Sequence, residues 1–292
     1  MSIAERWQGV VWVALSAVGF GAMAIFAKLA YRDGVSLSTM LFLRFAIAGA
    51  LLAAWGAWRG MRWPRGRDLL WLAAMGGVGY VGQSFSFFAA LQYASAGLVA
   101  LLLYLYPAIV TVLSALIFRR AIGRARGWAV ACALAGTALT VGGDLHSELP
   151  GILLGIACAF IYSGYILAGE GVMPRVGPQA AATVVMLSAA AVFGVAAAGA
   201  GLSLPASPSG WGAVLAIALA STLFAILGFF KGLEKLGAAD ASTLSTLEPL
   251  VTLGLAALVL GEGVTAMQLA GGALILAAVI YLARRPSVQA TG

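Results

Sequence analysis

Two charged residues lie inside long apolar stretches, where a charge needs either a partner or a water-filled cavity. Arg44 is about eight residues into the stretch 37–58, roughly 12 Å from its nearer end at 1.5 Å per residue. Glu248 lies near the middle of the stretch 238–260. One interpretation is a structural ion pair between Arg44 and an acid, and Glu262 is within reach by depth. The alternative makes Glu248 a carboxylate that binds and releases a proton.

Polar and aromatic side chains recur at helical spacings of three and four within several apolar stretches. Such a stripe suits the wall of a polar cavity, although any single stripe also fits packing against another helix. Stripes in several stretches together favour a common binding cavity. The residues predicted to line it are Phe20, Met23, Tyr80, Gln83, Ser84, Phe87, Tyr104, Tyr162, Tyr165, Phe224, Ser242, Ser245 and Thr246.

Two prolines also fall inside apolar stretches, at Pro107 and Pro249. A proline has no backbone N–H, so the carbonyls four residues earlier, those of Leu103 and Ser245, lose their helical partner. In lipid an unpaired carbonyl costs several kcal/mol, so each must meet protein, water or ligand. The two kinks are either static and repaired by neighbours, or hinges beside the cavity.

Other kinds of chemistry have little support in the sequence. The single histidine, His146, has no second histidine to share a metal, and we expect no metal and no cofactor. Cys132 and Cys158 lie in apolar stretches, where a thiol behaves as a small buried hydrophobe. The net charge of +7 comes from short arginine clusters between apolar runs, which argues against nucleic acid. An intramembrane enzyme is the alternative to a protein that only binds a ligand in such a cavity.

The elements that must position these residues are membrane-spanning helices. The chain has 292 residues, of which 62% are hydrophobic and 9% are charged, far from the composition of a soluble domain. A helix needs about 20 apolar residues to cross a bilayer. We therefore expect an all-α integral membrane protein. The apolar runs predict ten spans, near residues 9–30, 37–58, 69–90, 95–118, 127–143, 151–169, 178–201, 211–231, 238–260 and 265–283.

Lysine and arginine predict the orientation, since positively charged loops stay cytoplasmic. With the N-terminus inside, fourteen of the seventeen Lys and Arg residues fall in cytoplasmic segments. The outer side receives only Lys28 and Arg32, and Arg44 lies within a span. This distribution predicts that both termini are cytoplasmic, which agrees with an even number of spans.

An internal repeat appears at an offset of 142 residues. The segment from Phe87 lies without gaps over the segment from Phe229, which brings Pro107 over Pro249 and the Phe87-Phe88 pair over Phe229-Phe230. The chain thus divides into halves, residues 1–145 and 146–292, with five spans each. An odd number of spans inverts the second half in the membrane. Inverted repeats are typical of secondary transporters that bind substrate between the halves.

The sequence resembles the drug/metabolite transporter superfamily, and within it the ten-helix EamA-type exporters. The resemblance is carried by Leu247-Glu248-Pro249, by Leu260-Gly261-Glu262 with Gly271-Gly272 after it, and by Arg44-Phe45. The first half departs from the pattern, since Tyr106 stands where Glu248 does and Arg119-Arg120 stand where Gly261-Glu262 do. The resemblance implies a basket-like helical bundle around a central cavity, and the nearest branch is that of the YddG-type aromatic amino-acid exporters.

These observations predict a secondary transporter that exports aromatic or other apolar amino acids, or related small metabolites, across a bacterial inner membrane by alternating access. A cavity rich in Phe, Tyr, Ser and Gln with little fixed charge suits a zwitterion. Phosphorylated sugars would need several intramembrane cations, and only Arg44, Lys28 and Lys231 come near. Another metabolite or a drug is the alternative within the same fold. The partners expected are a small-molecule substrate and the lipid bilayer.

Overall fold

The structure, a computed structural model, describes residues 3–117, 123–144, 147–169, 172–236, 241 and 244–284. Within these residues it consists of helices and their connections and has no strand, which confirms an all-helical chain. Five residues named above, Arg119, Arg120, His146, Ser242 and Arg285, lie outside the described residues.

The described helices divide between the two halves of the chain. The first half contains α1 (Ile3–Gly21), α2 (Met23–Arg32), α3 (Leu37–Trp58), α4 (Gly66–Ala74), η1 (Met75–Tyr80), α5 (Val81–Tyr93), α6 (Ala96–Leu103), α7 (Tyr106–Ile117) and α8 (Arg124–Gly142). The second half contains α9 (Leu149–Gly169), α10 (Met173–Val176), α11 (Pro178–Ala200), α12 (Pro208–Ala218), η2 (Leu219–Phe224), α13 (Ala225–Leu236), α15 (Leu247–Leu255), η3 (Ala256–Leu260) and α16 (Ala266–Arg284). The three η segments are π-helices.

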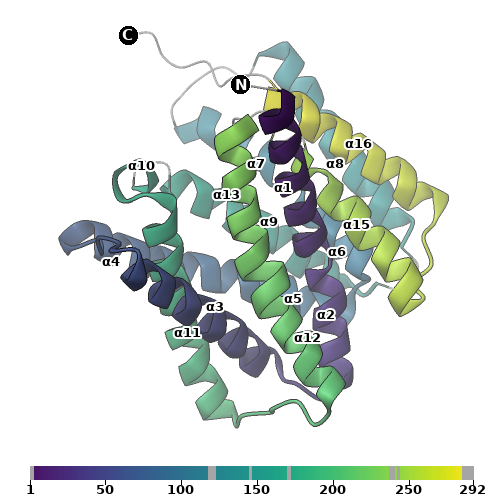
Figure 1. The fold of residues 1–292 in the computed structure, drawn as a ribbon. Helices are drawn as coiled ribbons and strands as arrows, with labels where there is room; N and C mark the ends of the chain where they lie inside the picture. Colours follow the sequence, from purple (N-terminus) through teal and green to yellow (C-terminus); the bar gives the residue numbers. More distant parts are fainter. Residues whose placement is uncertain are drawn as a thin grey trace, which may run out of the picture.

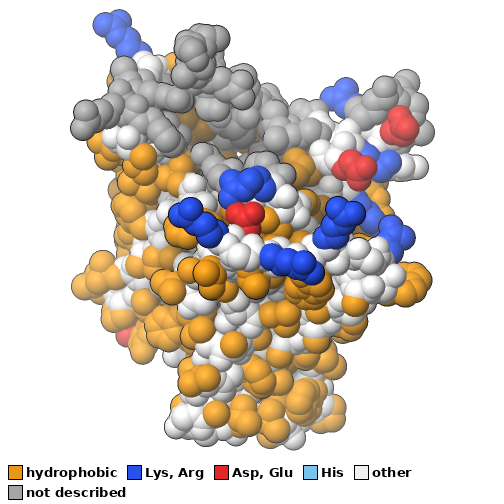
Figure 2. All heavy atoms as spheres, turned by 90° about the vertical axis from the view of Figure 1, so that its left-hand side faces the viewer, with side chains coloured by type: hydrophobic (Ala, Val, Ile, Leu, Met, Phe, Trp, Pro, Cys, Tyr) orange, Lys and Arg blue, Asp and Glu red, His pale blue; other side chains and the backbone are white. Residues whose placement is uncertain are grey.

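The outer surface of the bundle is apolar. Among the residues that the structure describes, six helical segments are long and apolar enough to cross a membrane, and three further apolar helices are shorter. Large side chains such as Val78, Val195 and Leu258 are more than 70% exposed, which suits contact with lipid. On the face drawn in Figure 2, Lys and Arg gather in a band across the upper part, and the body below it is apolar. The chain is therefore a multi-pass membrane protein, and the number of ten spans stays a prediction.

Helices shifted by 142 residues repeat one another in extent and in packing. The shift carries α8, residues 124–142, onto α16, residues 266–284, and these two helices pack together. It also relates α3 to α11, which pack together in the same way. The packing of α1 on α13 is repeated by the packing of α9 on α5. In Figure 1, α3, α4 and α11 form one side of the bundle, and α8 and α16 form the opposite side.

Both prolines follow a break in a helix. Pro107 is the second residue of α7, after the break at Tyr104 and Leu105 that ends α6. Pro249 is the third residue of α15, after a turn at Thr246. Proline is tolerated in the first turn of a helix, because the N–H groups there have no intrahelical partner. The sequence therefore placed the two breaks correctly, and a hinge role for them stays a prediction.

Two polar tethers occupy equivalent places in the two halves. The Asp33 carboxylate accepts hydrogen bonds from the backbone N–H groups of Ala206 (2.9 Å) and Ser207 (3.2 Å) and from the Ser207 hydroxyl (2.5 Å). Ser207 is the N-cap of α12. Arg175, 142 residues after Asp33, donates to Asp68 in the first turn of α4 over 2.6 Å. Each tether joins the segment just before a long helix of one half, α3 or α11, to the start of a helix in the other half.

We expect the tether between Asp33 and Ser207 to make stability depend on pH. The hydrogen bonds from Ser207 lower the pKa of the Asp33 carboxyl from its ordinary value, so the folded state favours the carboxylate. Asp33→Asn should lower the melting temperature of the purified protein at neutral pH. The difference from wild type should stay constant above about pH 5 and shrink as the pH falls below about 4, because the Asp33 carboxyl of the unfolded chain then binds a proton while that of the folded chain, with its lower pKa, still resists protonation. A difference in melting temperature that does not change with pH would show that the charge of Asp33 contributes nothing.

Candidate functional site

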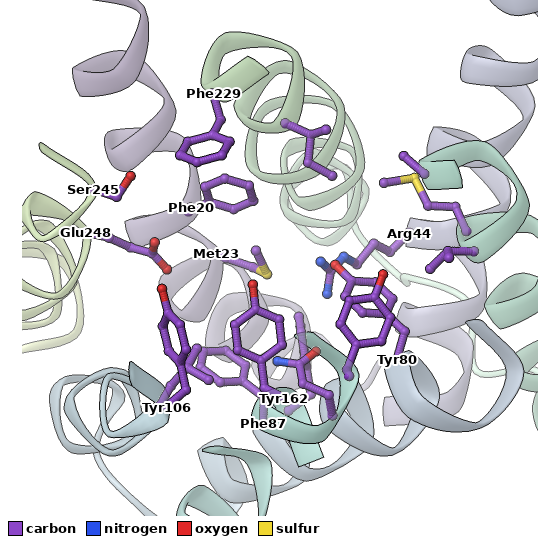
Figure 3. Close-up of a pocket in the computed structure, with 18 of the residues that line it drawn as sticks. Phe20, Met23, Arg44, Tyr80, Phe87, Tyr106, Tyr162, Phe229, Ser245 and Glu248 are labelled. Atoms are coloured by element: carbon purple, nitrogen blue, oxygen red, sulfur yellow. The ribbon is translucent and has the colours of Figure 1, made fainter. Parts of the chain in front are cut away.

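A cavity of about 490 Å³ lies between the two halves (Figure 3). Its size falls within the range of about 300–1,000 Å³ that is usual for small-molecule sites. Its walls are mostly aromatic and aliphatic, with one acid and one arginine. The residues that line it are Phe20, Met23, Arg44, Tyr80, Gln83, Phe87, Phe88, Leu103, Tyr104, Tyr106, Tyr162, Tyr165, Pro178, Ala182, Val185, Met186, Ile226, Phe229, Phe230, Ser245 and Glu248.

The structure brings most of the predicted cavity residues together. Nine of them line this cavity, and both intramembrane charges, Arg44 and Glu248, do so as well. Figure 3 shows these two charged residues on opposite sides, with Met23 between them. Whether these residues bind a substrate stays a prediction. The nine are Phe20, Met23, Tyr80, Gln83, Phe87, Tyr104, Tyr162, Tyr165 and Ser245.

Four predicted residues are not among those that line the cavity. Ser84 is buried and donates a hydrogen bond to the side-chain oxygen of Gln83 over 3.1 Å. Phe224 is 44% exposed and its ring lies 6.1 Å from that of Trp12. Thr246 is buried at the turn before α15, and Ser242 is outside the described residues. Phe224 ends the π-helix η2, whose wider turns shift the register, so a stripe drawn with the α-helical period does not stay on one face.

The repeat contained a signal for several cavity residues that the stripes missed. Seven pairs of lining residues are separated by 142 positions, so each half contributes one member of every pair. The missed residues include Phe88, Phe229 and Phe230, which belong to the duplicated Phe-Phe pair, and Tyr106, the equivalent of Glu248. The pairs are Phe20 with Tyr162, Met23 with Tyr165, Arg44 with Met186, Phe87 with Phe229, Phe88 with Phe230, Leu103 with Ser245, and Tyr106 with Glu248.

At the acidic side of the cavity, the Tyr104 hydroxyl repairs the break before Pro249. It donates to the carbonyl oxygen of Ser245 over 2.6 Å and lies 3.0 Å from Oε2 of Glu248. The Ser245 carbonyl is the one that Pro249 leaves without a helical donor, so the static reading of this kink has a structural basis. Neither Pro107 nor Pro249 is among the lining residues.

At the opposite side of the cavity, Arg44 is buried, with only 3% of the residue exposed. Its Nε donates to the Thr222 hydroxyl over 2.9 Å, and its carbon lies 4.7 Å from the ring centre of Phe45 and 5.2 Å from that of Phe88. Among the described residues no carboxylate lies within ion-pair distance of Arg44. Figure 3 shows Tyr80 beside the guanidinium.

The expected ion pair between Arg44 and an acid is therefore wrong for the described residues. Glu262, the acid thought to be in reach, pairs with Lys28 over 2.8 Å and accepts the backbone N–H of Ala96 over 2.8 Å. Lys28, in the second half of α2, is the cation that lies beside the loop carrying Glu262. The cation is held instead by a hydroxyl and by the negative faces of two rings.

A ladder of rings joins the two charged sides of the cavity. Tyrosine rings combine large apolar faces with a hydroxyl that needs a polar partner, so the ladder suits a ligand with an apolar body and polar ends. The centroid distances along it are 6.1 Å for Tyr104–Tyr106, 5.0 Å for Tyr106–Tyr162, 6.2 Å for Tyr162–Tyr165, 5.5 Å for Tyr165–Tyr80 and 5.5 Å for Tyr80–Phe45.

The remaining polar group of the wall, Gln83, is held in place by a buried thiol. Its amide nitrogen lies 3.5 Å from Sγ of Cys158, and that thiol lies 3.4 Å from the Gln83 carbonyl oxygen. Cys158 is buried, as expected, but Cys132 is exposed on the outside of α8, where an apolar surface toward lipid makes burial unnecessary. In the part of the chain that the structure describes, no three His, Cys, Asp or Glu residues are grouped to hold a metal.

Comparison with known proteins finds the same family in both halves of the chain. The EamA-like transporter family matches residues 7–142 and again residues 149–284. The uncharacterized transporter YcbK of Bacillus subtilis is 26% identical over 92% of this chain and 90% of its own length. A solved crystal structure with 24% sequence identity has the same fold, with a TM-score of 0.68 over 94% of this chain and 96% of that chain.

Two further relatives match over about half of their length. The aromatic amino acid exporter YddG of Ancylobacter novellus is 29% identical over 52% of this chain and 57% of its own length. The uncharacterized transporter YwfM of Bacillus subtilis is 28% identical over 51% of this chain and 50% of its own length. The chain therefore matches only about half the length of each of these two relatives.

We expect the Tyr104 hydroxyl to contribute more to stability than that of its neighbour Tyr106. Tyr104→Phe leaves the Ser245 carbonyl without a donor, which should cost about 1–3 kcal/mol of unfolding free energy. The matched control is Tyr106→Phe, because the Tyr106 hydroxyl makes no hydrogen bond to a described residue. Thermal unfolding in detergent measures both. Equal melting temperatures for the two variants would contradict the proposed repair of the helix break.

Proposed function

This chain belongs to the EamA-like transporter family, and we propose that within it the protein exports zwitterionic amino acids with aromatic or other apolar side chains. The observation that carries the proposal is the pairing of one arginine and one acid on opposite sides of a cavity with aromatic walls (Figure 3). A zwitterion presents one carboxylate and one ammonium group, which matches this pair of charges.

The role of Arg44 follows from the cost of an unpaired charge. A buried guanidinium with no anion beside it is expensive in a membrane, and a substrate carboxylate would supply that anion. Glu248 and the tyrosine hydroxyls around it offer acceptors for an ammonium group. The rings between them supply apolar and π surface for the side chain. The name of the YddG relative supports both the substrate class and the direction of transport.

Other substrates fit this cavity less well. A phosphorylated sugar would need more cations than the single arginine of the wall, because each phosphate carries up to two charges. Another small metabolite or a drug is the alternative within the family. An intramembrane enzyme is the non-transporter alternative, and membership of a family of transporters argues against it.

For the architecture, we propose ten spans in two inverted halves, residues 1–145 and 146–292, with both termini on the cytoplasmic side of a bacterial inner membrane. The two family matches begin 142 residues apart, and the helix packing repeats at the same offset. Fourteen of seventeen Lys and Arg residues fall on one side under this arrangement. In Figure 1, α1 begins and α16 ends at the same end of the bundle, which agrees with an even number of spans.

Substrate competition in proteoliposomes tests the assignment of the two charges. Phenylalanine should compete for transport better than phenethylamine, which lacks the carboxylate, and better than 3-phenylpropionate, which lacks the ammonium group. Arg44→Gln should reduce the preference over the amine by about tenfold or more, since a hydrogen bond to a charged group contributes about 1.5–3 kcal/mol. Glu248→Gln should reduce the preference over the acid by a similar factor. If both variants keep the wild-type preferences, the two residues do not bind the substrate.

Glu248→Gln also separates substrate binding from proton coupling. If Glu248 binds the ammonium group, the variant should lose substrate exchange and accumulation driven by a pH gradient to the same extent. A carboxylate that couples transport to protons predicts a different result, because glutamine cannot titrate. Exchange would then persist while gradient-driven accumulation disappears. Both activities are measured in the same proteoliposomes, and the melting temperature of the variant serves as the control for folding.

A further inference from the structure

Residues 59–67, which connect α3 to the first turn of α4 and which we call the arginine loop, carry four exposed arginines. No ion pair joins any of the four to a carboxylate of a described residue. The acid that follows the loop, Asp68, is paired with Arg175 over 2.6 Å. Four like charges within nine residues create a strong positive potential, which attracts anions to this part of the surface. The four are Arg59, Arg62, Arg65 and Arg67.

The equivalent connection in the second half has none of these charges. Residues 201–209, which lie 142 positions later and lead from α11 to α12, contain neither arginine nor lysine. There the Ser207 side chain caps α12, and Asp33 brings a carboxylate from the first half. At the start of α4 the N-cap is Arg65, which makes no side-chain capping bond, and Arg175 takes the place of Asp33. The arginines are therefore not needed to connect the two helices.

Exposed apolar side chains lie in and beside the arginine loop. Trp58 is 80% exposed and Leu70 is 71% exposed, and Trp63 and Trp71 are exposed as well. Tryptophan rings favour the boundary between lipid headgroups and hydrocarbon, and leucine suits contact with acyl chains. Figure 2 faces the side of the bundle that carries α4 in Figure 1, and there the band of Lys and Arg borders an apolar body. An anion held by the loop can therefore carry an apolar chain that continues along the protein.

We infer that the arginine loop binds the phosphate of an anionic phospholipid, whose acyl chains lie along the exposed face of α4. A guanidinium can bind a phosphate through two parallel hydrogen bonds, and a loop with four of them can hold the whole headgroup. A headgroup that also carries a cation leaves less net negative charge for the loop and binds more weakly. The site does not involve the cavity, so the inference does not depend on the proposed substrate.

Titration of phosphatidylglycerol into the purified protein, in micelles of an uncharged detergent, tests the inference. The melting temperature should rise with phosphatidylglycerol, and high salt should weaken the effect. The double variant Arg62→Gln/Arg65→Gln should need about tenfold or more phosphatidylglycerol for half of the rise, because each cation near an anionic lipid surface strengthens binding severalfold. The matched control Arg32→Gln/Arg124→Gln removes two exposed arginines outside the loop and should respond to phosphatidylglycerol like the wild type.

Two further ligands and the control variant decide between the sources of the effect. An equal rise with phosphatidylcholine would show that acyl chains alone stabilise the protein, and an equal rise with glycerol 3-phosphate would show a site for soluble phosphates. Either result would overturn the inference, and so would an equal loss of the response in the loop variant and the control variant. The melting temperature without lipid reports folding. If the double variant is less stable there, the single variants Arg62→Gln and Arg65→Gln replace it, each with an expected shift of about threefold or more.

Discussion

The absence of water inside a bilayer determines most of the polar contacts in this chain, because each polar group must find a partner within the protein. Hydroxyls on three helices donate to the carbonyl four residues earlier, those of Thr111, Thr137, Thr140 and Thr183. Thr222 accepts from Arg44 and donates to the carbonyl of Ile217, so one hydroxyl serves both a charge and a π-helical turn. The charge of Arg44 is an exception, since no carboxylate of a described residue pairs with it. Its side chain lines the cavity, where an anion could reach it.

The two halves repeat the same helix packing but place different charged side chains in the cavity. Arg44 has Met186 as its equivalent, and Glu248 has Tyr106, so neither charge is duplicated in the cavity. The inverted arrangement that we propose would make the two ends of the bundle equivalent, as in other transporters with inverted repeats. The proposed binding of a zwitterion by Arg44 and Glu248 would orient the substrate, because its two ends carry different charges. Under this proposal the differences between the halves, and not the repeat itself, supply the specificity.

Periodicity predicted much of the cavity wall. Gln83 and Phe87 in α5, and Tyr162 and Tyr165 in α9, were placed correctly because helical spacing keeps such residues on one face. Phe224 was misplaced because η2 is a π-helix, a local feature with no clear signature in apolar sequence. The Phe-Phe pair at 229–230 is indicated by the repeat and not by a stripe, because its equivalents Phe87 and Phe88 line the same cavity.

The sequence by itself determined that the protein lies in a membrane, that it is helical, that it is duplicated, and where its helices break before Pro107 and Pro249. Composition, periodicity and proline content are local properties of the sequence, so these features can be predicted from it. Only the tertiary structure decided which charges meet. Arg44 and Glu262 could reach each other by their depth in the sequence, yet Glu262 pairs with Lys28, and Arg44 donates to Thr222. The partner of a side chain depends on the rotation of its helix about the axis and on which neighbours pack there. The extent of the cavity is likewise absent from the sequence. The cavity reaches the first residue of α11 but only the eighth residue of α3, although the two helices are equivalent in the repeat. Two similar halves do not specify such a difference, which depends on how the helices pack.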